Sequence, residues 1–284
     1  MQDNFAVFIL SHGRAGNIKT LKMLKKGNYT GKTYIIIDNQ DEQGEEYKKL
    51  YGEENVIVFD KQYYKSISDY GDNGGNDSVV LWARNACHDI ARGLGLKYFL
   101  ELDDDYSSLD YRRIEGNKLA AYKAQNLDEL FTCFIKWLDD SGAMVIALSQ
   151  AGDFIGGAKS KRFSEKVLRK AMNAFFCDVD KQFQFYGRIN EDCTMYTLLG
   201  RQGKLILSVT EAMIVQTITQ KNKGGLTDIY LETGTYTKSF YSVMYSPSCV
   251  KVAAMGSKHK RVHHKINWNA CAPKILSEKW RKRE

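Results

Sequence analysis

An apolar, aromatic run in the first half of the chain ends in three consecutive aspartates. The run 98–102 leads directly into Asp103, Asp104 and Asp105. Carboxylate oxygens at alternating positions suit a hard divalent cation, and Mg²⁺ or Mn²⁺ is usually shared with the phosphates of a ligand. Ligands of parallel sheets bind at the carboxyl ends of the strands, so a metal site is one interpretation of this stretch. A strand followed by a plain acidic turn is the other.

A polar, glycine-containing loop follows the first apolar run. Residues 6–10 lead into Ser11-His12-Gly13-Arg14-Ala15-Gly16, and apolar residues then recur at helical spacing over 18–24. Small residues let the backbone pass close to a ligand. The order strand, loop, helix is typical of a nucleotide-binding start, although it contains neither a dinucleotide fingerprint nor a P-loop. Arg14 could meet a diphosphate with its planar fork, and a surface arginine fits the sequence equally well.

Two more candidates lie between this loop and the aspartates. The predicted strand 33–38 ends in Asp38, where a carboxylate can accept hydrogen bonds from a ribose or a base edge. The predicted helix 78–92 carries Arg84 beside its apolar stripe. Arg84 is therefore either an exposed helical arginine or a residue that faces the ligand.

A second acidic pair lies near the start of a later predicted helix. Glu191 and Asp192 follow Asn190, which can cap that helix. Acids in a first helical turn suit the helix dipole, and this explanation requires no chemistry. The alternative is that Asp192 lies beside an aromatic pocket and acts as a base.

Three of the five histidines lie within six residues near the end of the chain, among them His263 and His264. A neutral imidazole there could add a third protein ligand to the metal. A cluster of Lys, Arg and His is also an ordinary phosphate-contact patch. Both interpretations stay open at the level of the sequence.

These candidates must be positioned by strands that alternate with helices, which predicts an α/β fold with a mostly parallel central sheet flanked by helices. Further strands are predicted at 56–59, 144–148, 175–180, 204–208 and 213–219. A helix is predicted to start at Asn126 and to end at Ser141-Gly142. Residues 111–125 are interpreted as an irregular, basic connection, and the glycine-rich stretch 151–158 as an acceptor-side loop.

The composition excludes several classes of protein. The 284 residues are 43% hydrophobic and 12% aromatic, which supports a real core. No run approaches the ~20 apolar residues of a membrane span, and no signal peptide is indicated. The six cysteines contain no CxxC pair, so we expect reduced thiols in a cytoplasmic protein.

The net charge of +7 is concentrated at one end of the chain. Residues 251–284 contain ten Lys or Arg and two Glu, whereas the remaining residues contain 31 basic and 32 acidic groups. Such asymmetry suggests a polyanionic partner, although a solvated tail has the same composition. The cations expected to contact such a polyanion are Lys258, Lys260, Arg261, Arg281, Lys282 and Arg283.

The order of these motifs resembles the GT-A glycosyltransferase pattern of DxD, xED and a late histidine. More narrowly, SHGRAG, LELDDDY, NEDCTMYTLLG, MYSPSCVKVAAMG and RVHHKINW look like the TET-associated glycosyltransferase family. Many of its members are phage-encoded and are associated with attaching sugars to hydroxymethylated pyrimidines in DNA. The resemblance implies a GT-A-like fold with a C-terminal extension packed on it.

The same resemblance implies an activity. A sugar would pass from a UDP-sugar to the hydroxyl of a 5-hydroxymethylpyrimidine in DNA, most naturally 5-hydroxymethylcytosine, in the cytoplasm of an infected bacterial host. Asp103 and Asp105 would hold Mn²⁺ or Mg²⁺, with His263 or His264 as the late ligand. Asp192 would be the base, with Glu191 beside it. The residues implied at the nucleotide-sugar are Ser11, Gly13, Arg14, Asp38, Arg84, Asp103 and Asp104.

We therefore expect one domain over 1–284. Its parts would be a nucleotide-sugar-binding half over 1–125, an acceptor and catalytic half over 126–222, and a basic extension over 223–284. Two other functions fit the sequence. One is a GT-A enzyme acting on a polysaccharide or a protein, and the other is a non-catalytic DNA-binding module.

Overall fold

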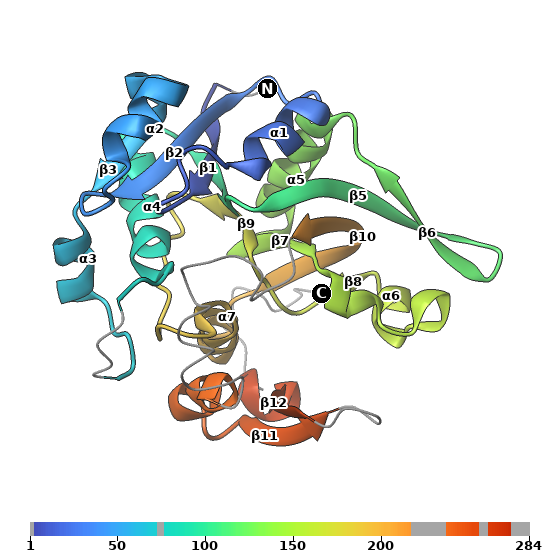
Figure 1. Cartoon of the computed structure of the whole chain (residues 1–284). Coiled ribbons are helices and arrows are strands. Elements are labelled where there is room, and N and C mark those ends of the chain that lie inside the picture. The colour runs from blue at the N-terminus through green and yellow to red at the C-terminus, as the bar shows by residue number, and fades with distance from the viewer. Residues whose placement is uncertain (1–2, 73–76, 217–236, 256–260, 274–284) are drawn as a thin grey trace, which may run out of the picture.

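A central sheet of ten strands organises the protein (Figure 1). The computed structural model describes residues 3–72, 77–216, 237–255 and 261–273. The strand order is β3-β2-β1-β4-β9-β7-β10-β5-β6, with β8 paired to β10, and a separate two-stranded sheet joins β11 to β12. Helices cover both faces of the large sheet, as expected of the predicted α/β class.

In the amino-terminal half of the sheet, every pair of adjacent strands is parallel. Its strands are β1 (Phe5–Leu10), β2 (Lys32–Asp38), β3 (Val56–Phe59) and β4 (Tyr98–Asp103). The intervening helical segments are α1 (Lys19–Lys26), α2 (Gly44–Tyr51), η1 (Glu53–Asn55), α3 (Lys61–Ile67) and α4 (Leu81–Gly93). Consequently the carboxyl ends of these strands meet at one edge, where Leu10 pairs in register with Asp103.

The second half of the sheet is mixed. Its strands are β5 (Tyr106–Glu115), β6 (Lys118–Lys123), β7 (Val145–Ser149), β8 (Val167–Leu168), β9 (Ala174–Asp178) and β10 (Ile206–Gln216). β9, β5 and β8 run against the direction that the other strands share. The sheet is thus mostly parallel in strand direction, as predicted, and β9 separates β4 from β7.

Two apolar clusters, one on each face, hold the layers together. On one face α5 (Leu127–Ser141) packs Phe131 and Ile135 against Val7 of β1 and Leu100 of β4. On the other face α4 and α7 (Glu191–Arg201) cover the sheet. Each fully buried large apolar side chain contributes roughly 1.5–3 kcal/mol, so these clusters fix the sheet that carries the site.

α5 shows how local sequence sets an element. Its apolar residues recur every three or four positions, and the helix ends at Gly142, whose φ of 64° is left-handed. A side chain at that position would be strained, so glycine is the residue that suits this end. The predicted start and end of this helix are confirmed.

Two predictions about the second half were wrong. Residues 111–125 are not an irregular connection, because most of them form the β5–β6 hairpin around Gly116 and Asn117. The predicted strands 204–208 and 213–219 are one strand, β10, which changes register between Val209 and Met213. Residues 217–219 lie outside the described part.

Short helical turns fill the loop after β7. They are η2 (Ala151–Phe154), η3 (Gly157–Lys159) and α6 (Lys161–Ser164). This is the stretch predicted to face the acceptor. Within the described residues, no helix has both the length and the apolar character needed to span a membrane.

The carboxyl-terminal elements pack beside α7 (Figure 1). They are a helix over 237–245, β11 (Val250–Met255), β12 (Arg261–Ile266) and α9 (Trp268–Cys271). The predicted DNA contacts Lys258, Lys260, Arg281, Lys282 and Arg283 lie outside the described residues. Of Arg261 only the place of its backbone in β12 is described.

Candidate active site

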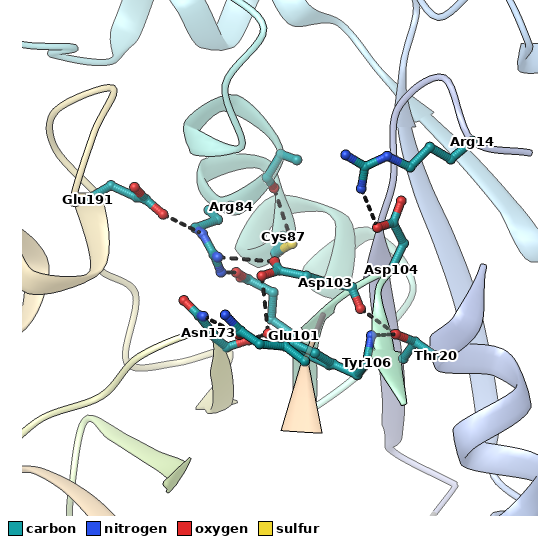
Figure 2. Close-up of polar contacts among 12 residues, drawn as sticks. Arg14, Thr20, Arg84, Cys87, Glu101, Asp103, Asp104, Tyr106, Asn173 and Glu191 are labelled. Carbon is teal, nitrogen blue, oxygen red and sulfur yellow. Dashed lines mark hydrogen bonds and ion pairs between the residues drawn. The ribbon is translucent and has the colours of Figure 1, made fainter. Parts of the chain in front are cut away.

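The aspartate triplet spans the last residue of β4 and the two-residue turn to β5, at the carboxyl edge of the parallel strands. Figure 2 shows Asp103 and Asp104 of this triplet. Thr20 of α1 fixes this turn. Its hydroxyl donates to the Asp103 carbonyl oxygen at 2.6 Å and accepts from the Tyr106 backbone N–H at 3.1 Å. The turn is therefore anchored on both sides by one buried side chain.

Asp103 is the most tightly oriented candidate metal ligand. Arg84 Nη2 donates to its Oδ1 at 3.1 Å. The Tyr106 hydroxyl lies 3.1 Å from its Oδ2 and shares its single proton between that oxygen and the Asn173 carbonyl oxygen. The side chain is 28% exposed. Each carboxylate oxygen has two lone pairs, so these bonds leave acceptor capacity for a cation.

Asp104 is buried, and its partners lie on the loop after β1. It accepts from Arg14 Nη1 and from the Ser11 hydroxyl, both at 2.7 Å. Burial raises its pKa even though Arg14 and Ser11 favour the charged form. Arg14 is thus not a fully exposed surface arginine. Its ion pair with Asp104 connects the loop 11–16 to the aspartate triplet.

Asp105 completes the triplet in a crowded electrostatic setting. Burial, followed by the negative charges of Asp103 and Asp104, raises its pKa to about 6. A divalent cation would relieve that repulsion, and carboxylate oxygens are the ligands that Mg²⁺ and Mn²⁺ prefer. The described residues contain no group of three His, Cys, Asp or Glu that could hold a metal. The residues present fit a site with two carboxylates that substrate phosphates complete.

Asp38 lies at the same edge and contacts a residue that the sequence did not single out. His12 Nδ1 lies 2.7 Å from Asp38 Oδ2 and 3.7 Å from Asp41 Oδ2. Asp41 also accepts from the backbone N–H of Gly13, whose φ of 65° is left-handed. The hydrogen bond to Asp38 raises the pKa of His12. Burial acts to raise the pKa of Asp38, but the hydrogen bond to His12 and the nearby positive charges outweigh burial and lower that pKa.

Arg84 is not an exposed helical arginine, since only 2% of its surface is accessible. Its guanidinium bonds to Glu101, to Asp103 at 3.1 Å and to Glu191 at 3.2 Å (Figure 2). It thereby joins the end of β4 to the start of α7. Glu101, buried within β4, was not identified from the sequence, because its partner lies 17 residues away on another element.

α7 begins with the predicted acidic pair. Both Glu191 and Asp192 are buried, and Asp192 Oδ1 accepts from the Cys193 backbone N–H at 2.6 Å. Burial and the charge of Asp192 raise the pKa of Glu191 to about 7. Asn190 precedes the helix in a left-handed conformation with φ of 61°. Contrary to the prediction, its side chain does not cap α7 but donates to the Ser242 hydroxyl at 2.6 Å.

β12 brings the two histidines to the start of α7. His264 Nδ1 lies 3.4 Å from Asn190 Nδ2, and its Nε2 lies 3.1 Å from Cys193 Sγ. Burial lowers the pKa of His264 to about 3, which keeps the imidazole neutral. The His263 ring centroid is 4.3 Å from that of His264. The described residues do not unite these histidines with Asp103 and Asp105 in one ligand set, and their metal role stays a prediction.

Fold and site together define an α/β protein with an acidic ligand site at the carboxyl edge of a mostly parallel sheet. The chain belongs to the TET-Associated Glycosyltransferase family, whose model matches residues 5–225. The family resemblance predicted from the motifs is confirmed, and the protein is a glycosyltransferase by family. No curated protein matches the chain.

The chain is also similar to solved structures of glucosyl-3-phosphoglycerate synthase from Mycobacterium tuberculosis. One, in complex with Mg²⁺ and UDP, aligns with a TM-score of 0.48 and 8% identity over 93% of this chain and 88% of that one. Another contains Mn²⁺, UDP and phosphoglyceric acid. It aligns with a TM-score of 0.46 and 9% identity over 93% of this chain and 87% of that one.

Proposed function

We propose that this glycosyltransferase moves a sugar from a UDP-sugar to the hydroxyl of a 5-hydroxymethylpyrimidine in DNA, with 5-hydroxymethylcytosine as the preferred base. Family membership supports glycosyl transfer. The observation that carries the proposal is the bridge through Arg84, which joins the acidic end of β4 to the acidic start of α7. Transfer needs two such sites side by side, one for the leaving diphosphate and one for the attacking hydroxyl.

The donor site in this proposal is the carboxyl edge of β1, β2 and β4. Asp103 and Asp105 would hold Mn²⁺ or Mg²⁺, which supplies positive charge to the departing diphosphate. Ser11, Gly13 and Arg14 lie on the loop after β1, where backbone and guanidinium can approach phosphates. The other proposed donor contacts are Asp38 and Asp104.

The acceptor side is the start of α7. A primary hydroxyl is a weak nucleophile, so a positioned carboxylate is needed to accept its proton. The Glu191 carboxylate is already paired with Arg84. We therefore assign Asp192 as the catalytic base. His263 or His264 would approach the metal from β12 once substrate is bound.

The DNA acceptor is supported by the name of the family and by the basic carboxyl-terminal segment. Lysines and arginines contact phosphates without regard to sequence. A target hydroxyl on a base requires that the base leave the helical stack. The proposal retains the division into 1–125 for the donor, 126–222 for the acceptor and catalysis, and 223–284 for DNA contact.

The site of action in this proposal is the cytoplasm of a phage-infected bacterium, where DNA and nucleotide-sugars occur together. The six cysteines are all free thiols, which is consistent with a reducing compartment.

Release of UDP tests the proposal. Purified protein with a UDP-sugar and Mn²⁺ is expected to release UDP slowly alone and faster with hydroxymethylated DNA, and EDTA should abolish both reactions. Unmodified DNA of the same sequence is the matched control. Equal rates with both DNAs would contradict the hydroxymethyl acceptor, and stimulation by a polysaccharide or a protein instead would replace it.

A further inference from the structure

Arg84 directs its three side-chain nitrogens to three carboxylates on two elements (Figure 2). Nη1 contacts Glu101 and Nη2 contacts Asp103, both on β4. Nε contacts Glu191, the first residue of α7, at 3.2 Å. A strand end and a helix start that lie far apart in sequence are therefore joined by one guanidinium.

Two aromatic rings lie beside that guanidinium. The Phe175 ring centroid lies 5.0 Å and the Phe185 centroid 5.6 Å from Arg84 Cζ. Arginine presents a planar fork in set directions, whereas lysine carries one point charge on a flexible stem. A lysine could keep the charge at this position but could not hold three carboxylates at the same angles.

The number of acids around Arg84 exceeds what charge balance requires. Glu101 is 1% exposed and alone compensates one guanidinium. The two further carboxylates, Asp103 and Glu191, belong to the proposed donor and acceptor sides. Their contacts with Arg84 set where the two sides lie relative to each other.

We propose that Arg84 is a positioning residue that holds Asp103 and the Glu191-Asp192 pair in one fixed arrangement, and that it does not bind the donor diphosphate. The inference rests on the proposed function, and it replaces the donor contact that the family resemblance implied for Arg84. A residue that is 2% exposed, with every nitrogen facing a protein carboxylate, offers a phosphate no accessible surface.

The effect of Arg84 on the metal follows from the surroundings of Asp103. Only Arg84 and Tyr106 are seen to orient its carboxylate oxygens in the described structure. Loss of a group that orients a metal ligand typically costs about 10–100-fold in metal affinity or activity. The effect on transfer follows separately, because Arg84 also fixes the start of α7.

Arg84→Lys is the principal test, since it keeps the charge and removes the fork. Arg84→Met combined with Glu101→Gln removes the arginine and its internal counter-charge together, so that the most deeply buried acid is not left uncompensated. Asn85→Ala is the matched control on the same helix. Asn85 is buried and bonds to Ser68 and to the backbone of Phe185, but to none of the three carboxylates.

Three quantities are measured on the full-length protein: the melting temperature, the affinity for Mn²⁺ in the presence of UDP by electron paramagnetic resonance, and the kinetics of transfer. For Arg84→Lys we expect Mn²⁺ affinity to fall about tenfold or more. At saturating Mn²⁺ we expect kcat for transfer to stay at least about tenfold low while KM for the UDP-sugar changes less than about threefold. Asn85→Ala should lower the melting temperature without changing Mn²⁺ affinity, and the double variant should behave as Arg84→Lys.

Two results would overturn the inference while the proposed function stands. If Arg84→Lys loses activity only in proportion to its unfolded fraction, as Asn85→Ala does, then Arg84 is structural. If UDP affinity falls and kcat recovers at saturating donor, then Arg84 contacts the diphosphate. A wild-type protein that binds no Mn²⁺ with UDP would instead overturn the proposed function, and the inference with it.

Discussion

At the scale of single residues, the three aspartates of one turn have three different surroundings. Asp103 is oriented by Arg84 and Tyr106, whereas Asp104 is buried against Arg14 and Ser11. Asp105 is crowded by the charges of its two neighbours. Asp103 and Asp105 are therefore the two acids proposed to hold the metal, and Asp104 anchors the preceding loop.

Asp105→Asn tests this division. We expect metal-dependent activity to fall at least about 100-fold, because one of two protein carboxylates is removed. The melting temperature without metal should not fall, because the substitution removes a negative charge that Asp103 and Asp104 repel. The rise in melting temperature that Mn²⁺ and UDP produce in the wild type should disappear. Unchanged metal dependence in a folded variant would show that Asp105 is not a ligand.

The His12–Asp38 pair predicts a pH dependence of stability. The pKa of His12 is raised above 6.5, so its contribution is full below 6.5 and is lost as pH rises through the folded value. The pKa of Asp38 is lowered below 3.8, so its contribution is lost as pH falls through the folded value. NMR titration should place the His12 pKa above 6.5 in the wild type and lower in Asp38→Asn. An identical pKa in both proteins would exclude the pair as the cause.

At the scale of elements, the sequence predicts best what is encoded locally. β1 is a continuous apolar run whose residues are all buried, and α5 is bounded by an asparagine and a glycine. The β5–β6 hairpin was not predicted because its residues are largely exposed and charged. β10 was split in two because Thr210 and Glu211, which lie between the two predicted strands, interrupt the apolar pattern.

The site was harder to predict than the fold for a related reason. Helical spacing placed Arg84 off the apolar stripe of α4, which is the position of a surface residue. Its burial depends on Glu191, 107 positions away, and no local pattern reports such a partner. The triplet itself was found because its acids follow directly on an apolar strand.

A substitution at Gly200 of α7 tests whether the carboxyl-terminal elements pack against this helix. A Cβ at Gly200 would lie 2.7 Å from Trp268 Cζ3. Trp268 is also covered by Arg169 at 4.9 Å, so its ring is held between neighbours. We expect Gly200→Ala to lower the free energy of unfolding by about 1–3 kcal/mol, measured by chemical denaturation.

Gly93 of α4 is the matched control, because a Cβ there meets nothing within 4 Å. Gly93→Ala should be neutral or stabilising by up to about 1 kcal/mol. If both alanines have the same effect, Trp268 does not pack on α7 as described.

At the scale of the whole molecule, charge is separated along the chain, and this predicts which segment the proposed DNA acceptor would contact. Replacing Arg281, Lys282 and Arg283 by alanine should flatten the salt dependence of DNA binding by about 0.9 in slope for each phosphate that the protein no longer neutralises. Release of UDP without DNA should be nearly unchanged. Fluorescence anisotropy over a series of salt concentrations measures the slope.

The β5–β6 hairpin supplies a control of equal charge. Its Arg113, Lys118 and Lys123 are exposed, and their replacement by alanine removes the same three charges. A larger effect from the carboxyl-terminal variant is expected. Equal effects would mean that residues 251–284 attract DNA only through their charge, as any basic residue of the protein would. A larger effect from the hairpin variant would mean that DNA binds at the hairpin instead.

Mass spectrometry of nucleosides tests the proposed reaction most directly. Hydroxymethylated DNA is treated with the protein, Mn²⁺ and a set of UDP-sugars, then digested to nucleosides. We predict a 5-hydroxymethylpyrimidine nucleoside heavier by one sugar residue with at least one donor. The product should be absent with Asp192→Asn, although that variant still binds UDP by titration calorimetry. UDP release without any modified nucleoside, with the sugar found on another acceptor, would contradict DNA glycosylation.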